Sequence, residues 1–266
     1  MKVLNLVGPG AMDVVEGLAP RLDGRVATVE TLPDAAAQPP GPETNTDADA
    51  SYGLSPDGSW IGAGDGRTLD GLLDELAPDY DYALAVGFAE ARLPTVVLGD
   101  ADAAGDVVVR ESAPESLDFE AVLDAVEALE PRVTLESLVR QVKRSPQAER
   151  SGAIATFTGR VRAKDADDDA PTRFLEFEKY EGVAEARMAD IREELEARDG
   201  VFEVAMHHRT GRIPDGEDIV FVVVLAGHRT EAFRTVEDGI NRLKDEVPIF
   251  KKESTADEEF WVHDRP

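Results

Sequence analysis

Cysteine is absent from this 266-residue sequence, which excludes disulfide bonds, thiolate metal sites and cysteine nucleophiles. Long apolar runs are absent as well. No stretch of about 18 apolar residues occurs, so the sequence predicts no transmembrane helix. The apolar N-terminal segment, residues 1–8, is too short and too strand-like for a signal peptide. Together these features predict a cytoplasmic protein.

Positive charge is scarce: 28 Lys and Arg stand against 55 Asp and Glu, for a formal net charge of −27. A surface this acidic repels nucleic acid and anionic membranes, so neither is expected as a partner. The charge is uneven, with a net of −20 in residues 1–130 and −7 in residues 131–266. Many carboxylates with few lysines resemble a halophilic protein, in which salt screens the self-repulsion. We therefore interpret the acidity as an adaptation of the surface, not as a clue to the substrate.

Lysine is rare, yet three of the seven lysines lie within nine residues: Lys244, Lys251 and Lys252. This concentration indicates amine chemistry, because an ammonium acts as a compact point charge or, partly buried, as an acid, base or nucleophile. The alternative is a solvated helix end, where the helix dipole favours cations. Composition leaves both interpretations open.

The first third alternates short apolar runs with helical segments, which is typical of a small α/β domain. The predicted strands are 2–7, 26–32, 82–88 and 95–98, and the predicted helices are 11–22 and 68–76. Residues 33–57 are rich in Pro, Ala, Asp and Thr and are expected to be a loop. We place this domain at residues 1–100. An acidic linker with a connecting helix is expected over residues 101–130.

The segment Gly8-Pro9-Gly10 lies between the first strand and the first helix, where a phosphate-binding loop would lie. A working P-loop continues to a lysine and a hydroxyl residue, but Asp13, Val14 and Val15 occupy the corresponding positions. Asp13 would also repel a phosphate. The residues therefore favour a tight turn, and the domain is interpreted as degenerate P-loop-like.

Residues 131–266 show a different pattern, in which short strands alternate with long helices. This pattern predicts an α+β domain built on a mostly antiparallel sheet. The expected strands are 153–161, 174–180, 201–209, 218–226, 249–253 and 260–262. The expected helices are 133–142, 183–198 and 230–246.

Basic residues that could bind an anion occur at two places in this second half. His228 and Arg229 open a helix, where backbone N–H groups also favour an anion; a plain turn is the alternative. Arg160 and Arg162 share one face of a strand end, and they could equally pair with the acidic run 165–169.

The adjacent histidines His207 and His208 point to opposite faces of a strand, so no metal site is predicted from them. The same alternation places Lys251 and Lys252 on opposite faces of a short strand. Only one of these two lysines can share a pocket with Lys244.

Five separated motifs in residues 131–266 resemble the catalytic large subunit of molybdopterin synthase, the MoaE family. They are, in order, Gly152–Arg162, Leu175–Tyr180 with Gly182, His207–Gly211, Gly227–Arg229, and Leu243–Glu253 with Trp261. The resemblance implies an α/β hammerhead fold and a sulfurtransferase without a bound cofactor. It also implies a homodimer that forms a heterotetramer with a small ubiquitin-like, MoaD-like sulfur carrier.

In that family, the carrier's C-terminal Gly-Gly thiocarboxylate supplies sulfur to cyclic pyranopterin monophosphate (precursor Z), which becomes the dithiolene of molybdopterin. The resemblance assigns the catalytic roles to Lys244 and Lys251. It assigns substrate binding to Arg160, Val161, Arg162, His228, Arg229, Lys244, Lys251, Lys252 and Glu253. A cyclic phosphate suits a pocket of guanidinium and imidazole groups. The alternative function is a non-catalytic binding platform or modification target for ubiquitin-like carriers.

The first domain is similar to the molybdopterin-guanine dinucleotide biosynthesis protein B (MobB) family, in the first strand–helix turn and in Tyr82–Phe88. That family is a P-loop GTP-binding adaptor. The sequence departs from it at the phosphate-binding residues, so a docking or assembly role in the same pathway is the expectation.

Overall fold

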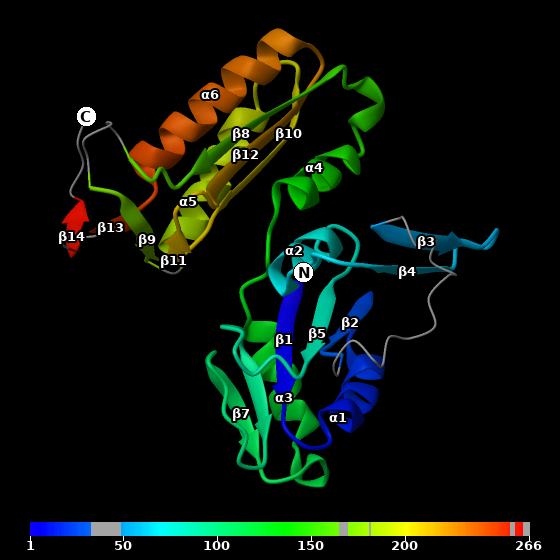
Figure 1. Cartoon of the computed structure of the whole chain (residues 1–266). Coiled ribbons are helices and arrows are strands. Elements are labelled where there is room, and N and C mark those ends of the chain that lie inside the picture. The colour runs from blue at the N-terminus through cyan, green and yellow to red at the C-terminus, as the bar shows by residue number, and fades with distance from the viewer. Residues whose placement is uncertain (33–48, 165–169, 181, 256–258, 263–266) are drawn as a thin grey trace. The chain divides into compact units, whose positions relative to one another are not determined.

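The computed structural model describes residues 1–32, 49–164, 170–180, 182–255 and 259–262. The chain divides into two compact units, Met1–Thr134 and Leu135–Pro266 (Figure 1). None of the described helices is long and apolar enough to cross a membrane.

The first unit is built on a parallel five-stranded sheet in the order β2-β5-β1-β6-β7. Its strands are β1 (Lys2–Val7), β2 (Val26–Glu30), β5 (Tyr82–Val86), β6 (Thr95–Leu98) and β7 (Val107–Glu111). Its helices are α1 (Ala11–Leu18), α2 (Leu69–Leu76) and α3 (Phe119–Ala128), with short 3-10 helices at Ala19–Arg21 and Pro114–Ser116. The helices cover the sheet, which explains why β1, β5 and β6 are buried along almost their whole length and are mostly apolar.

The main core of the first unit packs α1 and α3 against the sheet. Val14 and Leu18 of α1 and Val122 and Val126 of α3 lie in one buried cluster with Leu84 of β5. A second, smaller cluster joins Leu73 of α2 to Val3 and Ala83.

Two segments differ from the sequence-based expectation. Residues 101–130, expected as an acidic linker with a connecting helix, hold β7 and α3, and the division between the units falls after Thr134. The helix α3 is the one expected in this segment, whereas β7 and the packing of both elements against the core of the first unit were not predicted. The expected loop 33–57 contains β3 (Ala50–Leu54), which pairs with β4 (Trp60–Gly64); residues 33–48 lie outside the described residues.

The second unit contains two antiparallel sheets where the sequence predicted one. The first has the order β10-β12-β8 and the second β11-β9-β13-β14. The strands are β8 (Ala153–Arg160), β9 (Thr172–Lys179), β10 (Val201–His208), β11 (Gly211–Pro214), β12 (Asp218–Ala226), β13 (Ile249–Thr255) and β14 (Glu259–Val262). The antiparallel pairing agrees with the expectation, but the prediction of a single sheet was wrong. An alternating sequence pattern indicates where strands lie, but it does not indicate which strands pair.

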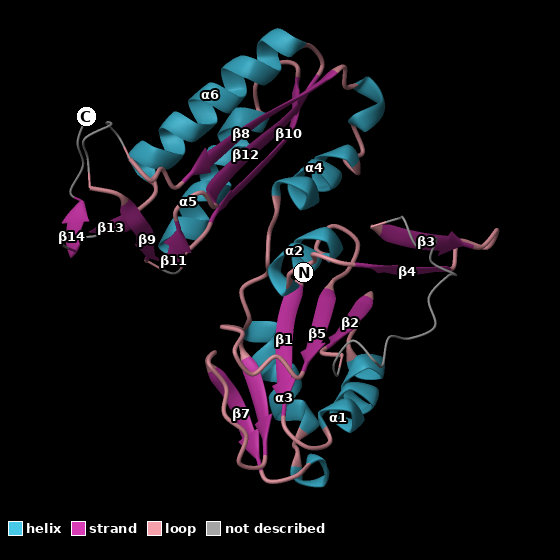
Figure 2. Cartoon of the chain, viewed as in Figure 1, coloured by secondary structure: helices cyan, strands magenta, loops and turns pink. Residues whose placement is uncertain are grey.

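Three helices surround the first of these sheets: α4 (Leu135–Lys143), α5 (Val183–Glu196) and α6 (Arg229–Glu246), with a short 3-10 helix at Ala148–Arg150. Figure 2 shows α5 and α6 as long helices beside the strands. Ile191 and Leu195 of α5 and Ile240 and Leu243 of α6 are buried in one cluster with β12. Each such side chain contributes about 1.5–3 kcal/mol when fully buried, so this core fixes the position of both helices on the sheet.

Candidate functional site

Arg160, Val161 and Arg162 lie at the end of β8. The Arg160 guanidinium is exposed and pairs with Asp218, with 3.3 Å between Nε and Oδ1. Val161 is buried, and its N–H donates to the Glu217 carbonyl at 2.9 Å. Arg162 is exposed. Val161 therefore anchors the strand end by its side chain and backbone, while the two arginines reach outward.

His228 and Arg229 lie at the start of α6, as the sequence predicted. His228 is the N-cap residue, and its side chain makes no capping hydrogen bond. Both side chains are exposed, and neither has a hydrogen bond or ion pair with another described residue. Two basic groups at a helix N-terminus, where cations are unfavourable, leave room for an anion.

Lys244 lies in the last turn of the same helix and is exposed. It too has no hydrogen bond or ion pair within the described part of the chain. At a rise of about 1.5 Å per residue, the backbones of Arg229 and Lys244 are about 22 Å apart. One chain therefore cannot bring His228, Arg229 and Lys244 into a single small pocket.

The topology places Lys244 and the arginines of β8 at the same end of the sheet. β12 runs antiparallel to β8, with Asp218 opposite Arg160 and Ala226 opposite Ala153. α6 follows β12, packs on both strands and returns toward the Arg160 end (Figure 1). His228 and Arg229 lie at the opposite end, near Ala153.

Lys251, Lys252 and Glu253 lie on β13, which begins just after α6. Lys251 is opposite Phe177 of β9, on the face that carries the buried Leu175 and Phe177. Lys252 is on the other face and pairs with Glu176, with 3.7 Å between Nζ and Oε2. The predicted opposite orientation of the two lysines is thus confirmed, and Lys251 is half-buried without an ion pair to any residue that the structure describes. The Glu253 carboxylate accepts a hydrogen bond from the Thr172 hydroxyl.

Comparison with known proteins decides the family. A family model described as MoaE protein matches residues 130–246. A "probable molybdopterin synthase" from Haloferax volcanii is 62% identical over 265 residues, which cover 100% of both chains. The chain belongs to the family of molybdopterin synthase catalytic subunits. The predicted family, its sulfurtransferase activity and the role in molybdopterin synthesis are confirmed by this membership.

Several solved structures are each similar to about half of this chain. Molybdopterin synthase from Staphylococcus aureus is 34% identical, with a TM-score of 0.41, and covers 44% of this chain and 83% of its own. A MobB protein homolog from Bacillus stearothermophilus is 20% identical, with a TM-score of 0.36, and covers 48% of this chain and 99% of its own.

The second unit also contains a partly buried polar cluster, which includes one of the two adjacent histidines noted in the sequence. The Lys179 ammonium binds Glu185 at 2.6 Å, and its side chain is only 12% exposed. Lys179 is opposite Ile249 in the β9–β13 register, so it shares the face of Lys251. The His208 ring packs edge-on against Phe177, with 4.8 Å between centroids. The period of two predicts that residues 175, 177 and 179 share one face of β9. It does not predict that His208, from another sheet, packs against that face.

The pKa of His208 is lowered from 6.5 to about 4, first by burial and then by the positive charge of Lys179. The folded synthase therefore holds this imidazole neutral. The unfolded chain binds a proton below pH 6.5 and the folded chain only near pH 4. The contribution of His208 to the free energy of unfolding is then fully present above pH 6.5 and is lost as the pH falls from 6.5 to 4.

We expect His208 to account for a loss of about 3 kcal/mol of unfolding free energy over this range. His208→Gln should flatten the pH dependence of urea unfolding between pH 7 and 4.5, measured in molar salt. Equal slopes in wild type and His208→Gln would contradict the assignment.

In the first unit, protein atoms pack against the Gly8-Pro9-Gly10 turn at the position where a P-loop would hold phosphate. A Cβ on Gly10 would lie 2.3 Å from Cγ of Pro114, and the Gly10 carbonyl accepts the Asp13 N–H at 3.0 Å. Asp13 is in the first turn of α1. Within the described residues, no group of three or more His, Asp or Glu side chains could hold a metal ion.

Proposed function

We propose that this synthase transfers sulfur from the C-terminal Gly-Gly thiocarboxylate of a small ubiquitin-like carrier to cyclic pyranopterin monophosphate at the site that Lys244 and Lys251 mark. The carrying observation is that both lysines keep their ammonium groups without a described protein partner, in a chain where acidic residues outnumber basic ones 55 to 28.

The chemistry of this reaction suits the residues at the Lys244 end of the sheet. Lys244 is proposed to move protons at the substrate carbons while sulfur is added, because an amine can both donate and accept a proton. Lys251, with Arg160 and Arg162, is proposed to hold the phosphate by charge-assisted hydrogen bonds. Lys252 and Glu253 follow Lys251 on β13 and complete the predicted substrate-binding set. The pterin is the substrate, and no bound cofactor takes part in the proposal.

We further propose a homodimer in which the site is shared between two copies. His228 and Arg229 have unused donors, yet they lie about 22 Å along α6 from Lys244. A two-fold dimer whose two α6 helices lie antiparallel across the axis would place the start of one α6 near the end of its partner's α6. One carrier would bind at each end of this dimer to give a heterotetramer. We propose that this heterotetramer acts in the cytoplasm.

Mixed dimers test the shared site. Lys244→Ala and Arg229→Ala homodimers should each be nearly inactive with thiocarboxylated carrier and precursor Z in molar salt. A mixed dimer of the two variants keeps one complete site of two, so it should recover about half of the wild-type rate. A Lys244→Ala/Lys251→Ala mixed dimer is the matched control and should stay inactive, because these lysines come from one chain. An inactive Lys244→Ala/Arg229→Ala dimer would overturn the sharing, and a wild-type protein without dithiolene product would overturn the reaction.

A further inference from the structure

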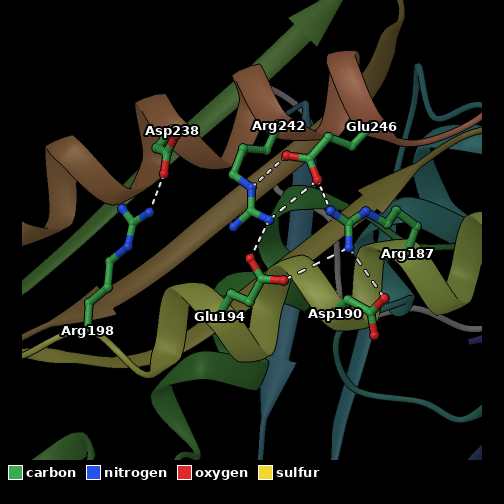
Figure 3. Close-up of polar contacts among 7 residues, drawn as sticks. All are labelled: Arg187, Asp190, Glu194, Arg198, Asp238, Arg242 and Glu246. Atoms are coloured by element: carbon green, nitrogen blue, oxygen red, sulfur yellow. Dashed lines mark hydrogen bonds and ion pairs between the residues drawn. The ribbon is translucent and has the colours of Figure 1, made fainter.

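An ion-pair network joins α5 to the last two turns of α6 (Figure 3). Arg242 donates from Nε to Glu246 at 2.8 Å and from a terminal nitrogen to Glu194 at 2.5 Å. Arg187 of α5 donates to the same Glu246 carboxylate and lies 3.4 Å from Asp190. Glu246 is thus held by one arginine from each helix.

The charges of this network are stable at neutral pH. The pKa of the Glu246 carboxyl is lowered, first by its hydrogen bond to Arg242 and then by that to Arg187. The Arg242 and Glu246 side chains are only 17% and 28% exposed, so solvent competes weakly for these bonds. The Arg242–Glu246 pair is therefore better protected from salt than the pairs to Glu194 and Asp190, whose side chains are 55% and 60% exposed.

The position of Glu246 is what makes the network useful. It is the last residue of α6, and Lys244 lies in the same final turn. The last carbonyls of a helix lack partners within the helix, and helix ends fray. Leu243 and Val247 bury one side of this turn against the sheet. At about 100° per residue, Glu246 and Lys244 lie on opposite flanks of that buried stripe.

Lys244 itself contacts no described partner that would fix it. The position of Lys244 therefore depends on the final turn of α6. The same turn sets where β13 begins, and so where Lys251 lies. We propose that Arg187, Arg242 and Glu246 are positioning residues for Lys244: they clamp the final turn of α6 to α5 so that the amine faces the reacting atoms. This inference rests on the proposed role of Lys244.

The same two helices supply a matched control. Arg198, just beyond the end of α5, pairs with Asp238 of α6 and is equally part of the helix–helix contact (Figure 3). Asp238 precedes Lys244 by six residues, about 9 Å along the helix. A purely structural role for the network predicts the same result for Arg187→Gln and Arg198→Gln.

The experiment compares Arg187→Gln, Glu246→Gln and Arg198→Gln in the full chain, assayed with thiocarboxylated carrier and precursor Z. We expect Arg187→Gln and Glu246→Gln to lower kcat about tenfold, because small misplacements of a catalytic group are costly. KM for carrier and pterin should not change, and Arg198→Gln should keep the wild-type kcat. Arg187→Lys, which retains a cation, should recover most of the rate.

Hydrogen exchange gives a second readout that does not depend on activity. The Val247 N–H bonds to the Leu243 carbonyl at 3.2 Å and reports on the final turn. Its exchange should be faster in Arg187→Gln than in Arg198→Gln. Equal kcat and equal exchange in these two variants would overturn the clamp while leaving the reaction intact. A fully active Lys244→Ala protein would instead overturn the role of Lys244 on which the clamp depends.

Discussion

Replacing Lys244 by alanine is expected to lower the rate of sulfur transfer by at least about a hundredfold, the usual contribution of a positioned proton-transfer group. The amine is exposed and without a described protein partner, so the folded state loses little with it. Alanine favours the helix, and the lost dipole interaction costs only about 0.3–1 kcal/mol. A large effect on rate with a small effect on unfolding would separate chemistry from stability.

Lys143→Ala is the matched control for this variant. Lys143 is also an exposed lysine in the last turn of a helix of the second unit, at the end of α4. Its removal should leave kcat and KM unchanged. Wild-type activity in Lys244→Ala would contradict the assigned role, and an equal loss in Lys143→Ala would reduce the effect to net charge.

A further variant, Lys244→Arg, distinguishes proton transfer from electrostatics. Arginine keeps the positive charge but does not give up its proton at neutral pH. If the amine moves protons, Lys244→Arg should be nearly as slow as Lys244→Ala. A rate close to wild type would show that only the charge at this position matters. The assay follows formation of the dithiolene product in single turnovers, with carrier and pterin saturating.

The sequence predicted the parts of the site that depend on local pattern. The period of two on β13 placed Lys251 and Lys252 on opposite faces, and the structure has them so. The helix over 230–246 placed Lys244 in a last turn, because Pro248 stops the helix soon after it. Local rules suffice for such features, since they depend on residues a few positions apart.

Other features of the site depend on contacts between residues far apart in the sequence, and local sequence patterns did not predict them. The predicted anion pocket grouped Arg162 with His228 and Arg229, which lie toward opposite ends of the sheet in one chain. Glu246 is a helix end by local pattern alone, and its partner Arg187 lies 59 positions away in the sequence. His208 was one of two adjacent histidines, and its lowered pKa comes from burial against Phe177 of another sheet.

The second large effect is expected in the first unit, where Gly8→Ala should destabilise the fold by more than about 3 kcal/mol. Gly8 has a φ of 115°, and a Cβ there would lie 2.1 Å from the Leu98 carbonyl oxygen. Leu98 is fully buried at the end of β6, next to β1 in the sheet, so it cannot move aside. The methyl group must therefore displace a core strand.

Gly66→Ala separates the clash from the backbone conformation. Gly66 has a φ of 82°, and no atom lies within 4 Å of an added Cβ. Only the left-handed conformation is then penalised, at about 1–2 kcal/mol. Calorimetry of the full chain in molar salt should show the first unit's transition lowered much more by Gly8→Ala than by Gly66→Ala.

This comparison also decides what the Gly8-Pro9-Gly10 turn is for. A glycine kept for a phosphate would tolerate alanine in the fold and lose nucleotide binding instead. If Gly8 is needed for packing against Leu98, alanine should instead disrupt the fold, with no nucleotide binding to lose. The negative charge of Asp13 in the first turn of α1 also disfavours a phosphate there. We expect no GTP binding by the wild-type chain in equilibrium dialysis and a strongly destabilised Gly8→Ala variant. GTP binding that Gly8→Ala abolishes without changing the unfolding transition would restore the P-loop interpretation.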